Sequence, residues 1–263
     1  GIYQVTGTNA SGCTSTSTAQ VIIADWVQTG SIAATDLDMN GRITRDGQVS
    51  TCAAPKACPG VFTTTGVRDY DIYTYTNLSS SPVCVTAFLS TTCGAGNPIF
   101  ASAYSNSFDP NNLCTNYLAD LGSSPVSSPG VMSFTVPALI TFYIVVSAVN
   151  AGGTCADYSL YVDIPRVPLA ITASGGNCAG SATLSCSIAN SYLWSTGATT
   201  QSILPPSTGT YTVTAGYGNN GCVSTTAQAI TINPVLTSIT GGGQYCGGTT
   251  VNLTASGAST YLW

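Results

Sequence analysis

The feature that most constrains the fold of this chain is an internal repeat. The stretch "ITASGGNCAGSATLSCSIANSYLW" at residues 171–194 is matched by "ITGGGQYCGGTTVNLTASGASTYLW" at residues 239–263. Both copies begin with Ile-Thr, carry a Cys, place a Leu on an alternating segment and close on Tyr-Leu-Trp. An internal repeat indicates a structural module that recurs along the chain and packs its apolar face against neighbouring segments.

A second pair of matching stretches divides the repeat into halves. The stretch "GTYTVTAGYGNNGCVSTTAQAITI" at residues 209–232 corresponds to "GIYQVTGTNASGCTSTSTAQVII" at residues 1–23. Residues 168–233 therefore hold a complete module, residues 234–263 the first half of another, and residues 1–24 the second half of another. Taken together, the two halves lack only the part equivalent to residues 195–208.

Half of a β-domain exposes unpaired strand edges and half of a core, which is an aggregation hazard unless a partner covers it. We therefore expect residues 234–263 of one unit to meet residues 1–24 of the next, head to tail. Two explanations stay open. Separate subunits complete each other's domain, as in donor-strand exchange, or the chain is one period of a longer tandem-repeat polypeptide.

Composition restricts the class of protein further. Only 6% of the residues are charged, and there is neither His nor Glu. A pI near 4.1 argues against a nucleic-acid partner, which needs a basic face. No apolar stretch reaches the ~18 residues of a membrane span; the nearest, residues 131–149, is expected to be two strands joined by a turn. The many Thr, Ser, Gly, Val and Tyr residues predict an all-β protein.

The complete module has the marks of an immunoglobulin-like sandwich. Trp194 lies on a strand in the middle of the module, and Tyr211 stands where a tyrosine corner would fall. The phrase "YLWSTGATTQSILPPSTGTYTVT" at residues 192–214 resembles the tandem Ig-like repeats of large secreted surface proteins and adhesins of Bacteroidota-type bacteria. That resemblance implies an element of an extracellular stalk or fibre.

Residues 25–165 form a different and larger module. Strand-like stretches occur at residues 69–77, 83–89, 132–136, 141–149 and 158–164. Their order, which closes on a Tyr-x-Leu-x-Val strand, resembles the jelly-roll type of β-sandwich in bacterial pre-peptidase C-terminal domains. The expected fold is thus all-β, with Ig-like modules and a larger jelly-roll-like sandwich stapled by disulfides.

Eleven cysteines without any His indicate disulfides in an oxidising compartment rather than a metal framework. In the module repeat, Cys178 and Cys222 flank the strands and are expected to pair, and the same alignment pairs Cys246 with Cys13 of a neighbouring unit. Cys186 aligns with Ala255, a small inward position, so we expect a free buried cysteine there.

The six remaining cysteines belong to the larger module, and they allow fifteen connectivities. Closure of a short loop favours Cys52–Cys58, with Cys93–Cys114 and Cys84–Cys155 as the accompanying hypothesis. Each bridge contributes about 2–4 kcal/mol of stability.

Few residues are candidates for a binding site. In "DLDMNG", the oxygens of Asp36, Asp38 and Asn40 match the first positions of a calcium loop, although Gly47 stands where such a loop needs a bidentate Glu. A β-turn with Asn-Gly at its tip is the favoured alternative. Residues 68–71, "RDYD", are expected to form a surface ion pair, or else to hold a cation. The tyrosines and the stretch from Phe100 to Tyr104 are candidates for stacking on sugars, but aromatic residues in strands more often belong to the core or to cross-strand pairs.

The residue inventory argues against an enzyme, because nucleophilic triads and Cys-His dyads need a base that a chain without His lacks. We expect no cofactor other than the candidate calcium ion. The favoured interpretation is a structural repeat unit of an extracellular bacterial filament or surface stalk, whose partners are copies of itself. The alternative is an adhesin module that binds glycans or a protein of a host or neighbouring cell through the larger sandwich.

Overall fold

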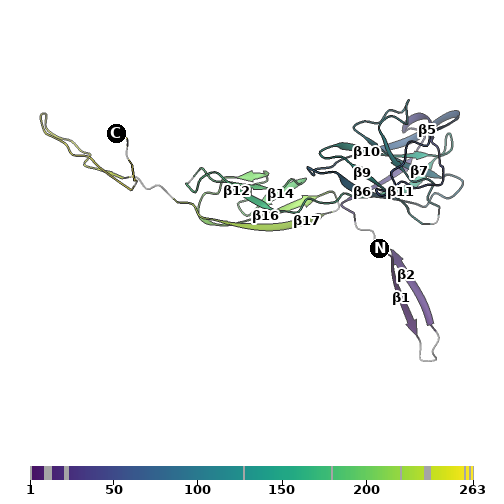
Figure 1. The fold of residues 1–263 in the computed structure, drawn as a ribbon, viewed down its shortest axis with the longest axis horizontal. Coiled ribbons are helices and arrows are strands. Elements are labelled where there is room, and N and C mark those ends of the chain that lie inside the picture. The colour runs from purple at the N-terminus through teal and green to yellow at the C-terminus, as the bar shows by residue number, and fades with distance from the viewer. Residues whose placement is uncertain are drawn as a thin grey trace. The chain divides into compact units, whose positions relative to one another are not determined.

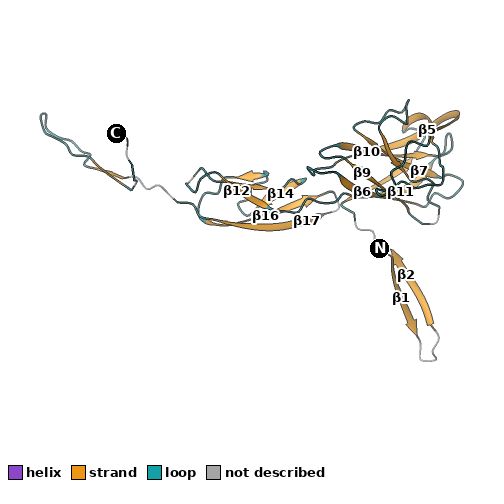
Figure 2. Ribbon diagram, viewed as in Figure 1, coloured by secondary structure: helices purple, strands orange, loops and turns teal. Residues whose placement is uncertain are grey.

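The computed structural model of the chain is all-β, and no helix occurs in its described part (Figure 2). Consequently, no helix that could span a membrane is found among these residues. The chain divides into two compact units, one of residues Gly1–Val167 with Tyr217–Cys222 and one of Pro168–Gly216 with Val223–Trp263. The structure describes residues 2–8, 14–20, 24–126, 128–178, 180–219, 221–233, 238–257, 259–260 and 262.

A nine-stranded β-sandwich makes up most of the first unit, and all its strand pairs are antiparallel (Figure 1). One sheet has the order β4 (Leu37–Ile43), β5 (Val61–Thr76), β10 (Thr141–Ala148), β7 (Ile99–Ser105) and β8 (Tyr117–Asp120). The other has the order β3 (Trp26–Ile32), β11 (Cys155–Asp163), β6 (Val83–Thr91) and β9 (Gly130–Val136). Residues 131–149 form two strands joined by a turn, as the sequence predicts.

Aromatic packing fills the space between the two sheets. The ring of Phe142 on β10 lies 5.7 Å from that of Phe134 on β9, edge to face, and 5.4 Å from that of Tyr75 on β5. All residues of β10 after Tyr143 are buried, which requires cover on both faces of its sheet. Phe108, in the loop after β7, packs on Tyr70 and Tyr104 and supplies part of that cover.

Three disulfides fasten the larger sandwich: Cys52–Cys84, Cys58–Cys114 and Cys93–Cys155. The connectivity expected from sequence, Cys52–Cys58 with Cys93–Cys114 and Cys84–Cys155, is therefore wrong. The stretch that holds Cys52 and Cys58 does not fold back on itself as a short closed loop. Instead, each of the two cysteines pairs with a segment that is distant in the sequence. Cys58–Cys114 joins this stretch to the loop between β7 and β8.

The complete module in the second unit consists of two three-stranded sheets. One has the order β12 (Ile171–Ser174), β13 (Thr183–Cys186) and β15 (Ser202–Ile203); the other has β14 (Ser191–Trp194), β16 (Gly209–Tyr217) and β17 (Cys222–Ile230). Leu184, Trp194 and Val213 lie in its core. The Tyr211 hydroxyl donates to the Ser207 carbonyl at 2.9 Å, which confirms the predicted tyrosine corner.

Two further hairpins complete the described structure. In one, β1 (Ile2–Thr8) pairs with β2 (Thr14–Gln20), and in the other β18 (Ser238–Thr240) pairs with β19 (Thr254–Ser256). Each forms a two-stranded sheet of its own. An isolated two-stranded hairpin has marginal stability in water at best.

Replacing both Cys58 and Cys114 by Ala should lower the free energy of unfolding by about 2–4 kcal/mol, because the bridge closes a long loop of the unfolded chain. Urea denaturation of the oxidised protein measures the effect. The matched control is Cys178→Ala, which removes an exposed free thiol and should change the stability by less than about 0.5 kcal/mol. Equal losses in both variants would contradict the assigned connectivity.

Candidate functional site

The predicted bridge between Cys178 and Cys222 is absent, and both thiols are free. Cys178 forms a β-bridge with Asn233, beyond the end of β17, whereas Cys222 is the first residue of that strand. About ten extended residues lie between Cys222 and Asn233, the residue beside Cys178. At the rise of a strand they span roughly 30 Å, which is far longer than a disulfide can bridge. Cys186 is free and 4% exposed in the module core. Cys246 is exposed and unbonded, and Cys13 lies outside the described residues.

The candidate calcium ligands do not converge on one point. The Asp36 carboxylate accepts a hydrogen bond from the Ala33 backbone N–H at 2.7 Å, in a turn before β4. Asp38 and Asn40 follow on β4 itself, whose extended rise separates Asp36 from Asn40 by roughly 13 Å. The expected Asn-Gly turn is wrong as well, because Asn40 precedes a β-bulge at which Gly41 has a φ of 84°. No cluster of three or more metal-binding side chains exists in the part of the chain that the structure describes.

Residues 68–71 belong to β5, and Arg68 does not lie at the surface, where the expected ion pair would place it. Arg68 is 1% exposed, and its Nε donates to the Val149 carbonyl at 3.0 Å. Asp71 accepts a hydrogen bond from the Tyr158 hydroxyl, which is 2.7 Å from that of Tyr73. Burial raises the pKa of Asp71 above its ordinary value, because desolvation outweighs the hydrogen bond from Tyr158.

Two of the aromatic candidates for sugar stacking, Phe100 and Tyr104, are core residues. Phe100 and Tyr104 on β7 are each 1% exposed, and Tyr104 packs against Phe108 with ring centroids 4.8 Å apart. Side chains with so little exposed area offer no stacking surface to a glycan.

The two separate hairpins, in contrast, expose apolar residues whose counterparts in the complete module are buried. Val213 on β16 is 0% exposed, whereas its counterpart Val5 on β1 is 67% exposed. Leu184 on β13 is 0% exposed, whereas its counterpart Leu253, just before β19, is 49% exposed. We call Val5 and Leu253 the half-module residues. These side chains therefore expose apolar surface that the complete module buries.

Each hairpin nevertheless has the local structure of the corresponding half of the complete module. Ile239 pairs with Ala255 in the register that joins Ile171 to Cys186. The hydroxyls of Thr6 and Thr16 are 3.1 Å apart, and so are those of their counterparts Thr214 and Thr225. The halves thus have the strand pairing of a module and lack the second sheet that would cover it.

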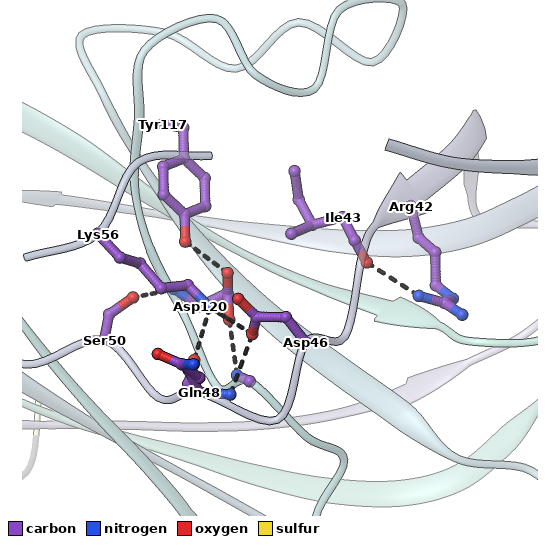
Figure 3. A network of polar contacts seen from close by, with 9 residues as sticks. Arg42, Ile43, Asp46, Gln48, Ser50, Lys56, Tyr117 and Asp120 are labelled. Atoms are coloured by element: carbon purple, nitrogen blue, oxygen red, sulfur yellow. Dashed lines mark hydrogen bonds and ion pairs between the residues drawn. The ribbon is translucent and has the colours of Figure 1, made fainter. Parts of the chain in front are cut away.

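A polar network that sequence reasoning missed is centred on Lys56 and Asp120 (Figure 3). The Lys56 ammonium lies 2.9 Å from Asp120 Oδ1 and 2.8 Å from Asp46 Oδ1, and it donates to the Gln48 carbonyl at 2.6 Å. The Asp120 side chain is completely buried, and that of Lys56 is 16% exposed. The sequence contains one signal for this network: Lys56, the partner of the buried Asp120, is the single lysine of the chain.

Further donors surround the Asp120 carboxylate. The Tyr117 hydroxyl donates to Oδ2, and the Gly122 backbone N–H donates to Oδ1 at 2.6 Å. Hydrogen bonds from Lys56 and the Gln48 N–H hold the pKa of Asp46 below its usual value. Every charge in the network therefore has a counter-charge or several donors, as a buried ion pair requires.

Residues 46–52 connect this network to the edges of both sheets of the larger sandwich. The Ser50 N–H donates to the Asp120 carbonyl at 3.1 Å, next to β8, and the Ser133 N–H of β9 donates to the Ser50 carbonyl at 3.0 Å. A third bond runs from the Gly47 N–H to the Gly122 carbonyl at 3.0 Å. This segment covers two strand edges that would otherwise be open to another chain.

A buried arginine lies on β4 in the same module. Arg42 is 7% exposed, stacks over the Phe62 ring at 4.4 Å, and donates to the Ile43 carbonyl, while its Nε has no hydrogen-bond partner among the described residues. Burial, followed by the charges of Arg45 and Arg68, lowers the pKa of Arg42 to about 10. Arg42 therefore stays protonated at neutral pH.

Comparison with known proteins assigns this chain to no family. No protein-family model matches the chain, and no curated protein does. The C-terminal CBM6 of LamC, a marine laminarinase from Zobellia galactanivorans, shares 12% identity over 51% of this chain and 99% of its own, with a TM-score of 0.21. A β-1,2-glucanase from Parabacteroides distasonis shares 12% identity over 80% of this chain and 37% of its own, with a TM-score of 0.22.

A viral protein is also among the similar structures. The VP2 subviral particle of infectious bursal disease virus shares 16% identity over 55% of this chain and 34% of its own, with a TM-score of 0.20. At such scores the likenesses are compatible with an all-β fold and carry no argument about activity.

Replacing Asp71 by Asn should raise stability relative to the wild type more at pH 7 than at pH 3. Because the folded-state pKa of Asp71 is raised, its stabilising contribution is present below the unfolded value of about 3.9 and is lost as the pH rises through the folded value. Asn keeps an acceptor oxygen for the Tyr158 hydroxyl and carries no charge. Urea denaturation at both pH values tests this, with exposed Asp38→Asn as the control; an equal difference at both pH values would contradict it.

Replacing Gly122 by Ala should destabilise the protein strongly. A Cβ there would lie 2.4 Å from the Gln48 carbonyl carbon and 2.7 Å from the Val49 nitrogen, so backbone would have to move. The matched control is Gly152→Ala, since Gly152 has nearly the same φ, 65° against 67°, but nothing within 4 Å of the added Cβ. Both variants should lose about 1 kcal/mol to the left-handed conformation, and Gly122→Ala about 1–3 kcal/mol more. Equal losses would mean that residues 46–52 do not pack on Gly122.

Proposed function

We propose that this chain is a structural repeat unit of an extracellular filament or surface stalk, joined head to tail by completion of a split β-sandwich module. One observation carries the proposal. The same module positions are buried in the complete copy and exposed in the two half-copies, as Val213 and Val5 illustrate at 0% and 67% exposure. The occupant of each exposed face is the complementary half-module of the next unit.

Energetics favour this occupant over solvent. Burying one Val or Leu side chain contributes about 1.5–3 kcal/mol, so burial of the two half-module residues favours association. The covering sheet is already specified, because the two hairpins have the strand pairing of the corresponding halves of the complete module. Joining the halves therefore requires no change in the register of either hairpin.

Three disulfides in one module agree with an oxidising environment such as the outside of a cell. Since Cys178 and Cys222 remain unbonded in the complete module, the split module is not expected to be sealed by Cys246 and Cys13. Contact between half-modules is therefore the joining interaction that we propose.

An adhesin that binds glycans through the larger sandwich has less support. Its aromatic candidates Phe100 and Tyr104 are buried. One solved relative is a carbohydrate-binding module, but its TM-score of 0.21 is too low to transfer a function.

Replacing Val5 by Asp should abolish head-to-tail association, because a carboxylate would have to be buried at the position of Val213. The matched control is Val223→Asp, since Val223 is also a strand valine, 59% exposed, but belongs to the complete module. Sedimentation velocity over a range of concentrations should show assemblies for the wild type and Val223→Asp and monomers for Val5→Asp.

Two outcomes bear on the proposal directly. Identical behaviour of all three proteins would contradict completion through the half-modules. Electrophoresis of native material after reduction then decides how units are connected: a band near 26.6 kDa means separate subunits, and a mass many times larger means one continuous polypeptide.

A further inference from the structure

The network around Lys56 brings a primary amine against a buried carboxyl group. Lys56 Nζ lies 2.9 Å from Asp120 Oδ1, and the Asp120 side chain is 0% exposed (Figure 3). A second carboxylate, that of Asp46, lies 2.8 Å from the same nitrogen and is 33% exposed. An amine, a carboxyl group and a neighbouring proton acceptor are the components of amide formation.

We propose that Lys56 and Asp120 condense to an intramolecular isopeptide bond in the folded protein. The Lys56 ammonium gives a proton to the Asp46 carboxylate, and the neutral Nζ attacks Cγ of Asp120. A bond from Nζ to Cγ forms and one Cγ–O bond breaks. The departing oxygen takes two protons from the former ammonium and leaves as water, so the positive and the negative charge both disappear. The step needs no oxidant, reductant or other reactant.

Asp46 is placed to relay the proton. Its Oδ1 is within hydrogen-bond distance of Lys56 Nζ, so one short transfer deprotonates the nucleophile. The same carboxyl group can return the proton to the departing oxygen. Its depressed pKa means that at neutral pH it is the carboxylate, the form that accepts a proton.

Two donors point at the oxygens of Asp120, where negative charge develops in the tetrahedral intermediate. The Gly122 N–H donates to Oδ1 at 2.6 Å, and the Tyr117 hydroxyl donates to Oδ2. Donors fixed in a water-poor site stabilise such charge without reorganisation.

The fold holds the two reacting groups together before any reaction. The Ser50 N–H donates to the Asp120 carbonyl, and the Asp120 N–H donates to Ser50 Oγ at 3.0 Å. Gly122 leaves no space for a Cβ against Gln48, so the two segments are in direct backbone contact. Such fixed proximity replaces a bimolecular encounter, so the condensation needs no separate enzyme. This inference concerns the larger sandwich alone and does not depend on the proposed assembly.

Intact mass measurement of the full chain tests the bond. After reduction and alkylation of every cysteine, the protein should be lighter by one water molecule than its sequence requires. Cleavage after Lys and Arg should then leave residues 46–68 uncut at Lys56 and joined to residues 69–166. The full sequence mass, with a free peptide of residues 46–56, would overturn the proposal and leave Lys56–Asp120 as an ion pair only.

Variants of Lys56 and Asp46 test which side chains take part in the condensation. Lys56→Arg keeps the positive charge but cannot form the amide, so it should have its full sequence mass; a missing water in this variant would locate the loss elsewhere and overturn the proposal. Asp46→Asn removes the proton acceptor with little change in shape, and it should also keep its full mass. A missing water in Asp46→Asn would overturn the role of Asp46. Circular dichroism of each variant confirms that it is folded.

Discussion

The buried carboxylate of Asp120 is the interaction on which one side of the larger sandwich depends. A carboxylate without solvent contact is tolerated only when cations and donors surround it, and here Lys56, the Gly122 N–H and the Tyr117 hydroxyl supply them. Two of these three partners come from β8 and its immediate continuation, whereas Lys56 comes from the stretch before β5. The ion pair between Lys56 and Asp120 therefore holds that stretch beside β8. The backbone of the stretch also forms hydrogen bonds with both sheets.

Once that stretch is in place, the disulfides follow from it. Cys52 and Cys58 flank Lys56 in sequence, and each is carried to a different partner, Cys84 on β6 and Cys114 beyond β7. A chain with only 6% charged residues has few ion pairs to organise its loops, so covalent links and one buried charge cluster take that part. Cys52, Cys58 and Lys56 therefore all hold the same stretch in place, and this stretch covers the sheet edges against pairing with other strands.

The sequence predicts part of the regular structure, because strands carry local signals, but β3, β4, β7 and β8 are not among the expected strands. The five expected strands of the larger module all exist, and the Tyr211 corner forms as predicted. Two other failures concern contacts between segments that are distant in the sequence. The pairing of Cys58 with Cys114 and the contact of Lys56 with Asp120 depend on the path of an irregular stretch that has no periodicity. The metal motif at Asp36 failed because a bulge at Gly41 lets the same residues continue as a strand.

The half-modules and the larger sandwich place opposite demands on stability. A joint made by completing a split module depends on apolar residues such as Val5 and Leu253, which must stay accessible until a partner arrives. A body between two such joints has to keep its form under any force that the joints transmit, and noncovalent β-contacts at its strand edges are the first to open. The Cys58–Cys114 disulfide and the condensation that we propose beside it would close those edges covalently. Only the contacts at the joints could then open and re-form. In the assembly that we propose, the reversible contacts would therefore lie in the two hairpins and the permanent ones in the module between residues 25 and 165.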